Sequence, residues 1–205
     1  MPPSLRLLSL PALLVALAAC GDDSDPRRDT GPAPVAPVAR DAALAWTVQL
    51  ESDWSPTDAV AVGGVTVLST SWEIDEGTDV VAYDEDGEVA WDYGGIYGAA
   101  LLAMVGDDQV LVCGDDDAVL LSTTDGTVVD EVGPDDERCP VADDDAGIPV
   151  DHHDEAYTVS GTELAVSSAG EEYTVALDVS DPEIWGVDAG VVAFDDDTDR
   201  VLVYR

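Results

Sequence analysis

The residue types that carry most enzymatic and nucleic-acid chemistry are scarce in this chain. Its seven basic residues are all arginine and face 45 Asp and Glu residues, which gives a formal net charge of −38. Without lysine there is no phosphate-binding loop, no Schiff base and no lysine general base, and neither Gly-x-Ser-x-Gly nor Gly-x-Gly-x-x-Gly occurs. Because binding to a phosphate backbone requires Lys and Arg to replace counterions, we do not expect nucleic acid as a partner.

The two histidines are the first candidates for a metal site. His152 and His153 lie between Asp151 and Asp154 in a polar stretch. Adjacent residues of an extended chain point in opposite directions, so the available pairs are His152 with Asp154 or Asp151 with His153. Each pair is at least one ligand short of a closed site, and a polar loop is the simpler interpretation.

The aspartate clusters are the second candidates. Asp195, Asp197 and Asp199 come closest to the spacing of a calcium loop, but Arg200 stands where the loop needs glycine. We expect weak divalent-cation binding at most, no dedicated metal site and no cofactor. The simpler reading of these acids is a solvated, self-repelling surface, which resembles that of proteins from saline habitats. A GC-rich genome would also deplete lysine.

The first 19 residues predict an export signal. Arg6 precedes an apolar run that is too short to span a bilayer and is soon followed by charge. Residues 17–20, LAAC, resemble the lipobox of bacterial lipoproteins, which implies cleavage before Cys20 and attachment of diacylglycerol to it. The chain would then be anchored to a membrane of the cell envelope, facing the periplasm or the cell surface. The alternative is a plain secretory signal cleaved after Ala18, with Cys20 as a bystander.

The mature chain divides into a tether and one domain. Residues 20–41 are rich in proline, alanine and aspartate, which favours an extended linker. Residues 42–205 contain the apolar segments of a single core. Once Cys20 is set aside, Cys113 and Cys139 form an even pair in an exported chain, so we expect a disulfide between them. Two buried free thiols are the alternative.

Beyond residue 40 the apolar residues alternate, and no stretch of ten residues has helical periodicity, so the domain is predicted to be all-β. Glycine turns separate the expected strands. Three groups of four strands are expected, over residues 58–93, 100–132 and 156–187. Four-stranded units of about 40 residues are typical of propeller blades, so we expect a small β-propeller-like array of about four blades. A β-sandwich is the alternative.

One sequence pattern recurs in this array. Residues 81–91, VAYDEDGEVAW, combine an Ala-x-Asp, a turn glycine and a closing tryptophan. This combination resembles the repeat of quinoprotein-type (PQQ-like) β-propellers. A second copy, at 119–130, has Asp130 where tryptophan is expected, and a third, at 175–185, has Pro182 in place of the glycine. Family propellers are usually much longer, so the resemblance implies a miniature ring of about four blades or an open array.

The two ends of the domain carry unpaired strands. Residues 43–50 form a lone strand, and residues 191–195 and 200–204 form a terminal hairpin without a fourth strand. Propellers commonly close by pairing strands from the two termini, which removes exposed edges. We therefore expect Trp46 beside the C-terminal hairpin, the termini of the domain as neighbours, and a last unit of only three strands.

These features predict a non-catalytic binding or scaffold module that acts in envelope assembly or protein interaction. Trp54, Trp72 and Tyr97, which lie in loops, are the candidate contacts for a protein partner. The alternative that the resemblance implies is a quinone- or calcium-dependent enzyme. That family often uses adjacent cysteines, whereas here Cys113 and Cys139 are far apart in the chain.

Overall fold

The computed structural model describes residues 38–72, 77–140, 156–168, 171–187 and 190–205. These residues form fifteen β-strands and no helix, as the alternating pattern predicts. The strands make four antiparallel sheets, three with four strands and one with three. The chain is therefore an all-β, β-propeller-like array of four small sheets, and the two-sheet sandwich is wrong.

Sheet I contains the two hairpins that the sequence predicts most clearly. Its strands are β2 (Ser55–Val62), β3 (Val65–Ser71), β4 (Thr78–Tyr83) and β5 (Val89–Ile96). Gly63 and Gly64 turn β2 into β3 with φ values of 61° and 86°, which a two-residue hairpin loop requires. Every side chain of β3 is buried, because other parts of the molecule cover both faces of the sheet.

Sheet II repeats this arrangement with shorter strands. They are β6 (Leu101–Val105), β7 (Gln109–Cys113), β8 (Ala118–Ser122) and β9 (Val128–Val132). The face turned away from sheet I carries a separate apolar cluster with Leu111 and Leu120, and Cys139 packs against it. A disulfide joins Cys113 and Cys139 with 5.8 Å between their Cα atoms, as the cysteine count predicts. The bond holds the segment after β9 against this face.

Sheet III has three strands where the sequence predicted four. It contains β10 (Ala156–Ser160), β11 (Glu163–Ser168) and β12 (Glu171–Ala176). The expected fourth strand, β13 (Glu183–Val187), belongs to the next sheet instead. Asp181 donates its backbone N–H to the carbonyl of Gly161 and accepts the Gly161 N–H on its carboxylate. These bonds hold the chain at the β10–β11 turn, so it does not fold back beside β12.

Sheet IV joins the two ends of the domain. Its strands run in the order β1 (Leu44–Gln49), β15 (Arg200–Tyr204), β14 (Gly190–Asp195) and β13. Trp46 lies opposite Val203, and Ala43 and Arg205 exchange two backbone hydrogen bonds of 3.1 and 3.2 Å. The predicted pairing of the termini is confirmed, but the expectation of three strands in the last unit is wrong because β13 completes it.

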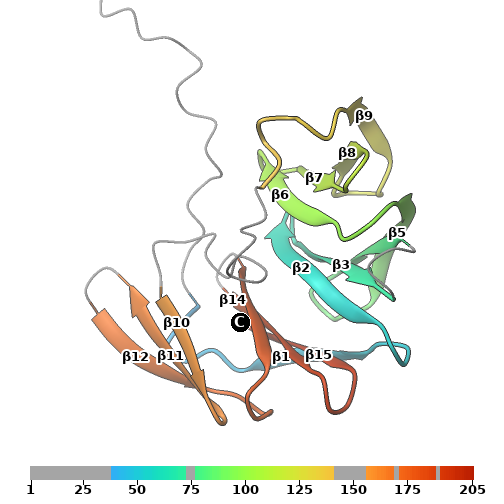
Figure 1. The fold of residues 1–205 in the computed structure, drawn as a ribbon. Helices are drawn as coiled ribbons and strands as arrows, with labels where there is room; N and C mark the ends of the chain where they lie inside the picture. Colours follow the sequence, from blue (N-terminus) through green and yellow to red (C-terminus); the bar gives the residue numbers. More distant parts are fainter. Residues whose placement is uncertain (1–37, 73–76, 141–155, 169–170, 188–189) are drawn as a thin grey trace, which may run out of the picture.

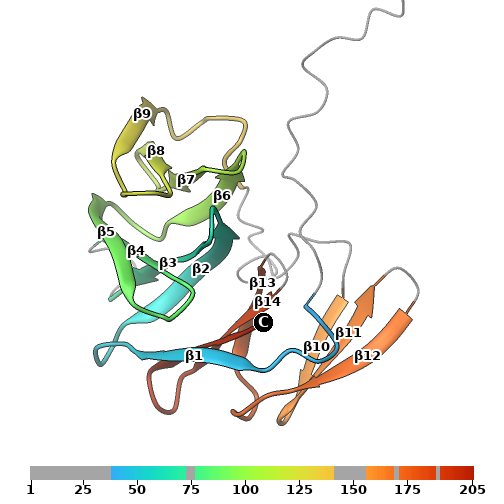
Figure 2. The ribbon, with the colours of Figure 1, turned by 180° about the vertical axis from the view of Figure 1, so that it is seen from behind.

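The four sheets follow one another along an open arc in the order III, IV, I and II (Figures 1 and 2). Strand β2 lies against β6 on one side and β13 on the other, so these are the inner strands. Separate apolar clusters join sheet III to IV, IV to I and I to II. No such cluster joins sheets II and III within the described ranges, so the described residues form the open array rather than the closed ring. Residues 141–155, which connect these sheets, lie outside the described residues.

Tryptophans on the outer strands lock neighbouring sheets together. Trp46 in β1 lies against Gly87 in the β4–β5 turn, where an added Cβ would come within 2.9 Å of the Trp46 side chain. Trp91 in β5 lies in the same way against Gly126 in the β8–β9 turn, at 2.8 Å. The Nε1 of Trp91 also donates a hydrogen bond of 2.7 Å to the carbonyl of Thr123. Sheets IV and I, and sheets I and II, are thus joined by the same kind of contact, between a tryptophan of an outer strand and a turn glycine of the next sheet.

Sheet II lacks the tryptophan that would make the same contact with a further sheet. Asp130 stands four residues after Gly126, as Trp91 stands four residues after Gly87, and it is exposed. A carboxylate does not replace an indole in a buried contact, because burial of an unpaired charge is costly. The arc of described sheets ends at the sheet in which the tryptophan is missing.

The sequence copy at residues 175–185 is not a structural copy. Trp185 lies in β13, the inner strand of sheet IV, and packs in the same apolar cluster as Trp46. Trp91, its supposed equivalent, lies in the outer strand of sheet I. The proposed third repeat is therefore wrong, because a short apolar segment followed by tryptophan occurs in inner and outer strands alike.

Candidate functional site

One end of sheet I brings four segments of the chain together. In an antiparallel sheet the start of one strand lies beside the end of the next. The start of β2, the end of β3, the start of β4 and the end of β5 therefore lie at the same end of the sheet. The register places Ser71 opposite both Ser55 and Thr78, and Thr78 opposite Ile96. Residues that flank these positions therefore meet although they are far apart in sequence.

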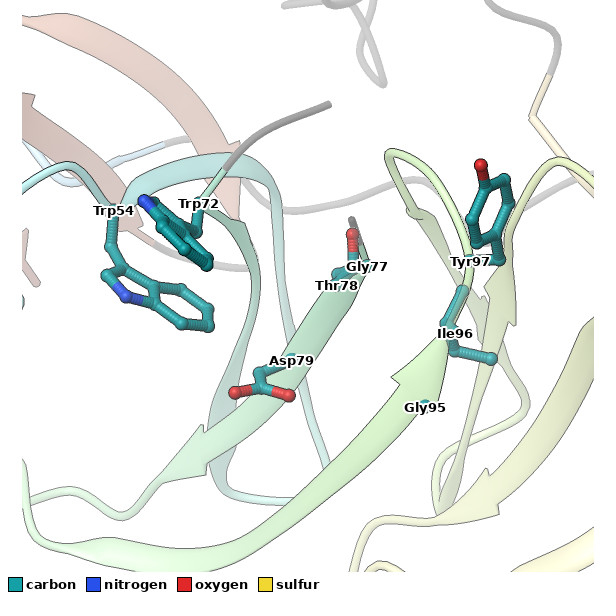
Figure 3. Close-up of a pocket in the computed structure, with 8 residues that line it drawn as sticks. All are labelled: Trp54, Trp72, Gly77, Thr78, Asp79, Gly95, Ile96 and Tyr97. Carbon is teal, nitrogen blue, oxygen red and sulfur yellow. The ribbon is translucent and has the colours of Figure 1, made fainter. Parts of the chain in front are cut away.

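A hollow of about 330 Å³ lies at this end of sheet I (Figure 3). Eight residues line it: Trp54, Trp72, Gly77, Thr78, Asp79, Gly95, Ile96 and Tyr97. The two indoles lie on one side, Ile96 and Tyr97 lie on the other, and the Asp79 side chain lies between them (Figure 3). The volume is at the lower end of the roughly 300–1,000 Å³ found for ligand pockets, which suits one side chain or a small ligand.

The hollow contains all three aromatic residues that the sequence named as candidate contacts. Trp72 is 50% exposed and Tyr97 is 51% exposed, while Trp54 is partly buried. The other three tryptophans, Trp46, Trp91 and Trp185, are buried between sheets. Half-exposed large aromatic side chains around one concavity are typical of a binding surface.

Asp79 is the charged group of the hollow, and sequence reasoning did not single it out. It lies in β4 opposite Gly94, where an added Cβ would come within 2.9 Å of its Oδ1. Glycine at that position leaves the space that the carboxylate occupies. Within the described part of the chain, the Asp79 carboxylate has no hydrogen-bonding or ion-pairing partner. The only sequence signal was an acid beside the aromatic loops, in a chain full of acids.

Hydrogen bonds hold the Tyr97 side of the hollow in place. The Thr78 hydroxyl donates to the carbonyl of Gly98, and the backbone N–H of Asp115 donates to the carbonyl of Tyr97 at 3.3 Å. Nearby, the hydroxyls of Ser69 and Thr57 both donate to the Ala100 carbonyl, at 2.7 and 3.1 Å. The loop between β5 and β6 is therefore fastened to sheet I, and the position of Tyr97 is defined.

Two further carboxylates lie behind Tyr97. An added Cβ on Gly114 would come within 2.8 Å of the Tyr97 carbonyl and 3.1 Å of Asp117 Oδ1, which places these groups close together. This oxygen of Asp117 is buried and has no hydrogen-bonding partner among the described residues. Asp115 lies beside Gly98 in the same region. Carboxyl groups therefore lie near the Tyr97 side of the hollow as well as in it, at Asp79.

A buried carboxylate lies at the boundary between sheets I and II. Asp58 in β2 accepts hydrogen bonds of 2.7 Å from the backbone N–H groups of Ala59 and Leu102, so it links β2 to β6. Burial raises the pKa of Asp58 to about 7, although the two backbone hydrogen bonds act in the opposite direction. From the sequence alone, Asp58 is only an acid within an apolar strand.

The predicted calcium-like cluster is a turn closed by an ion pair. Asp195 accepts a hydrogen bond of 2.9 Å from Arg200 and another from the Thr198 hydroxyl, at the β14–β15 turn. The hydrogen bonds from Thr198 and Arg200 lower the pKa of Asp195. Within the described ranges, no three His, Cys, Asp or Glu side chains are grouped so that they could hold a metal ion.

The remaining predicted residues lie outside the described part of the chain. They are the lipidation residue Cys20 and the weak metal candidates Asp151, His152, His153 and Asp154. Their roles stay predictions. In the part of the chain that is described, no helix has the length and apolar character needed to cross a membrane.

No protein-family model and no curated protein matches this chain. Among solved structures, it is similar to a protein of unknown function from Bacteroides caccae, with 10% identity and a TM-score of 0.30 over 73% of this chain. It is also similar to BamB from Moraxella catarrhalis, with 13% identity and a TM-score of 0.19 over 78% of this chain. The chain spans 59% of the first protein and 66% of the second.

Proposed function

We propose that this chain is a lipid-anchored, extracytoplasmic binding module that holds a protein partner at the aromatic hollow and performs no catalysis. The observation that carries the proposal is the convergence of Trp54, Trp72 and Tyr97 from three separate segments around one concavity. Two of these side chains are half exposed, whereas Trp46, Trp91 and Trp185 are buried. Aromatic anchors in a pocket are the typical centre of a protein interface.

The placement of the hollow supports this function. It opens at the strand ends of sheet I, which lies between sheets IV and II in the arc and is covered on both faces. A rigid sheet that presents side chains from its loops is the usual arrangement of a binding site. The residues that line the hollow include no histidine, cysteine or serine, and the hydroxyl of Thr78 donates a hydrogen bond to the carbonyl of Gly98.

The anchor rests on the N-terminal sequence. An export signal followed by Cys20 implies lipidation, and the proline-rich residues up to 41 would hold the domain away from the bilayer. The partner is then a protein of the same envelope compartment.

Capture from membranes tests the proposal. Full-length lipidated protein is used to capture partners from detergent-solubilised envelope membranes, and a palmitate analogue reports the anchor. We expect the W72A/Y97A variant to lose most of the captured partner, and the V89A/V129A variant, which removes exposed apolar side chains on the outer strands, to keep it. We expect the label on wild-type protein and none on the C20A variant. Equal capture by both double variants would contradict binding at the hollow, and label on C20A would contradict the anchor.

A further inference from the structure

The hollow combines two features that attract the same kind of ligand. The faces of Trp54, Trp72 and Tyr97 carry partial negative charge, and a cation within about 6 Å of a ring centroid is attracted to it. The carboxylate of Asp79 lies between these rings and accepts hydrogen bonds without donating any when ionised. Aromatic faces around an acceptor-only anion match a donor-rich organic cation.

The surroundings exclude an anionic ligand and favour a cationic one. Asp115 and Asp117 lie behind Tyr97, and the whole chain carries a formal charge of −38. Exposed charges farther away are screened over about 8 Å at physiological salt, so at that salt concentration the groups in and beside the hollow decide binding. Phosphates, nucleotides and acidic peptides would all be repelled there.

The chain itself shows how it binds such a cation. The guanidinium of Arg40 lies 4.9 Å from the centroid of the Tyr173 ring, and it pairs with Glu171 at 2.7 Å. A guanidinium is planar, stacks on aromatic faces and binds a carboxylate through two parallel hydrogen bonds. The hollow offers the same two partners, an aromatic face and a carboxylate, to a guanidinium from another molecule.

The described arginines are all engaged elsewhere. Arg40 binds Glu171, Arg138 binds Asp136, Arg200 binds Asp195 and Arg205 binds Thr66. Each of these contacts lies away from the residues that line the hollow. None of the described arginines therefore supplies a cation to the hollow, whose volume of about 330 Å³ suits a single long side chain.

We propose that the hollow binds an arginine side chain in a basic segment of the partner protein, with the guanidinium stacked on the indoles and paired with Asp79. This proposal rests on the proposed function and adds the chemistry of the contact. Lysine fits less well, because its compact ammonium neither stacks nor makes a bidentate pair. The acidic surface guides the basic segment towards the hollow, and the rings and Asp79 select its arginine.

The test uses 5-fluorotryptophan in the full lipidated chain, held in phosphatidylcholine nanodiscs, and fluorine NMR at about 0.15 M salt. The probe is a pentapeptide with a single arginine, and the matched control replaces arginine with citrulline, which has the same shape without the charge. We expect saturable shifts of the Trp54 and Trp72 resonances with the arginine peptide only. The buried Trp46, Trp91 and Trp185 are internal controls and stay unshifted.

Variants locate the contact. D79N is expected to weaken binding of the arginine peptide about three- to tenfold, as the loss of a charge-assisted pair requires. Y97F retains binding and Y97A weakens it, because the aromatic ring of Tyr97, and not its hydroxyl, contacts the peptide. D196N, which removes an exposed acid in the β14–β15 turn, leaves the affinity unchanged.

Four results would overturn the proposal: no shift with the arginine peptide, equal shifts with the citrulline peptide, equal loss in D79N and D196N, or saturable shifts with a neutral oligosaccharide instead. These failures are distinguishable from failure of the proposed function. If W72A/Y97A still loses its captured partner while the arginine peptide does not bind, only the chemistry assigned to the contact is wrong.

Discussion

At the scale of single residues, Asp58 and Asp79 show how burial divides one residue type into two roles. Asp58 has no exposed surface and accepts two backbone N–H groups between β2 and β6, whereas Asp79 is exposed at the hollow. Two hydrogen bonds of 2.7 Å to backbone donors orient the buried carboxylate, but they do not offset its loss of hydration. The pKa of Asp58 is consequently raised to about 7.

Asp58 makes stability depend on pH in a predictable direction. Because its folded pKa, about 7, exceeds the ordinary value of 3.8, the folded state binds more protons between these values. Stability from this group is therefore fully present below pH 4 and is lost as the pH rises through 7, by an amount of about 4 kcal/mol.

The D58N variant removes this titration. We expect the free energy of unfolding of wild-type protein, relative to D58N, to fall as the pH rises from 4 to 8, measured by urea denaturation at each pH. In D58N the amide NH₂ replaces one of the two oxygens that accept a backbone N–H, so one N–H loses its acceptor. This costs about 1–3 kcal/mol at every pH and shifts the plot of unfolding free energy against pH without changing its slope. The other carboxylates titrate in both proteins and cancel. Parallel pH curves would contradict the raised pKa.

Much of the candidate site was predictable at the residue scale, and Asp79 was not. Trp54 and Trp72 stand in loops outside the alternating positions of strands, while Trp46 and Trp91 stand within strands and are buried. That distinction is local and can be read from the sequence. The meeting of the loop aromatics with Asp79 depends on the register of four strands, which no local pattern specifies.

At the scale of elements, the turn glycines that contact tryptophans couple the sheets. Gly126 has φ 68° and Gly161 has φ 61°, so both adopt a conformation that costs an L residue about 1–2 kcal/mol. They differ in their surroundings. An added Cβ at Gly126 would meet Trp91 at 2.8 Å, whereas nothing lies within 4 Å of one at Gly161.

This difference predicts unequal effects of one substitution. G161A should lose only the conformational term, and G126A should lose a further 1–3 kcal/mol, roughly, because Trp91 must move out of its packed position. Urea denaturation of both variants measures the two losses, and near-ultraviolet circular dichroism reports displacement of the indole. Equal losses in the two variants would show that the Trp91–Gly126 contact contributes nothing to the coupling of sheets I and II.

The hairpins were predictable and the grouping of strands was not. Glycine pairs and single turn glycines fix each hairpin locally, so sheets I and II formed as expected. The placement of β13 in sheet IV rather than in sheet III depends on the Asp181–Gly161 hydrogen bonds, which join residues far apart in sequence. The pairing of β1 with β15 was foreseen because each end of the domain had an incomplete unit.

At the scale of the whole molecule, the arc of four sheets covers both faces of sheet I and leaves the aromatic hollow open at the ends of its strands. Sheet I lies between its neighbours and is held on both sides by tryptophan–glycine contacts. The acidic surface, with a formal charge of −38 for the whole chain, guides basic partners to the molecule, and the groups in and beside the hollow decide binding there. Fold, charge and hollow together support the proposed function of a binding module.

The most direct test of that function is site-specific photo-cross-linking in intact cells. A photoreactive phenylalanine analogue is placed at position 97, beside the hollow, and in a matched strain at Val89, which is 58% exposed on the outer strand β5. We expect one adduct of defined mass from position 97, in the membrane fraction, and none from position 89. Adducts of the same masses from both positions, or none from position 97, would contradict it.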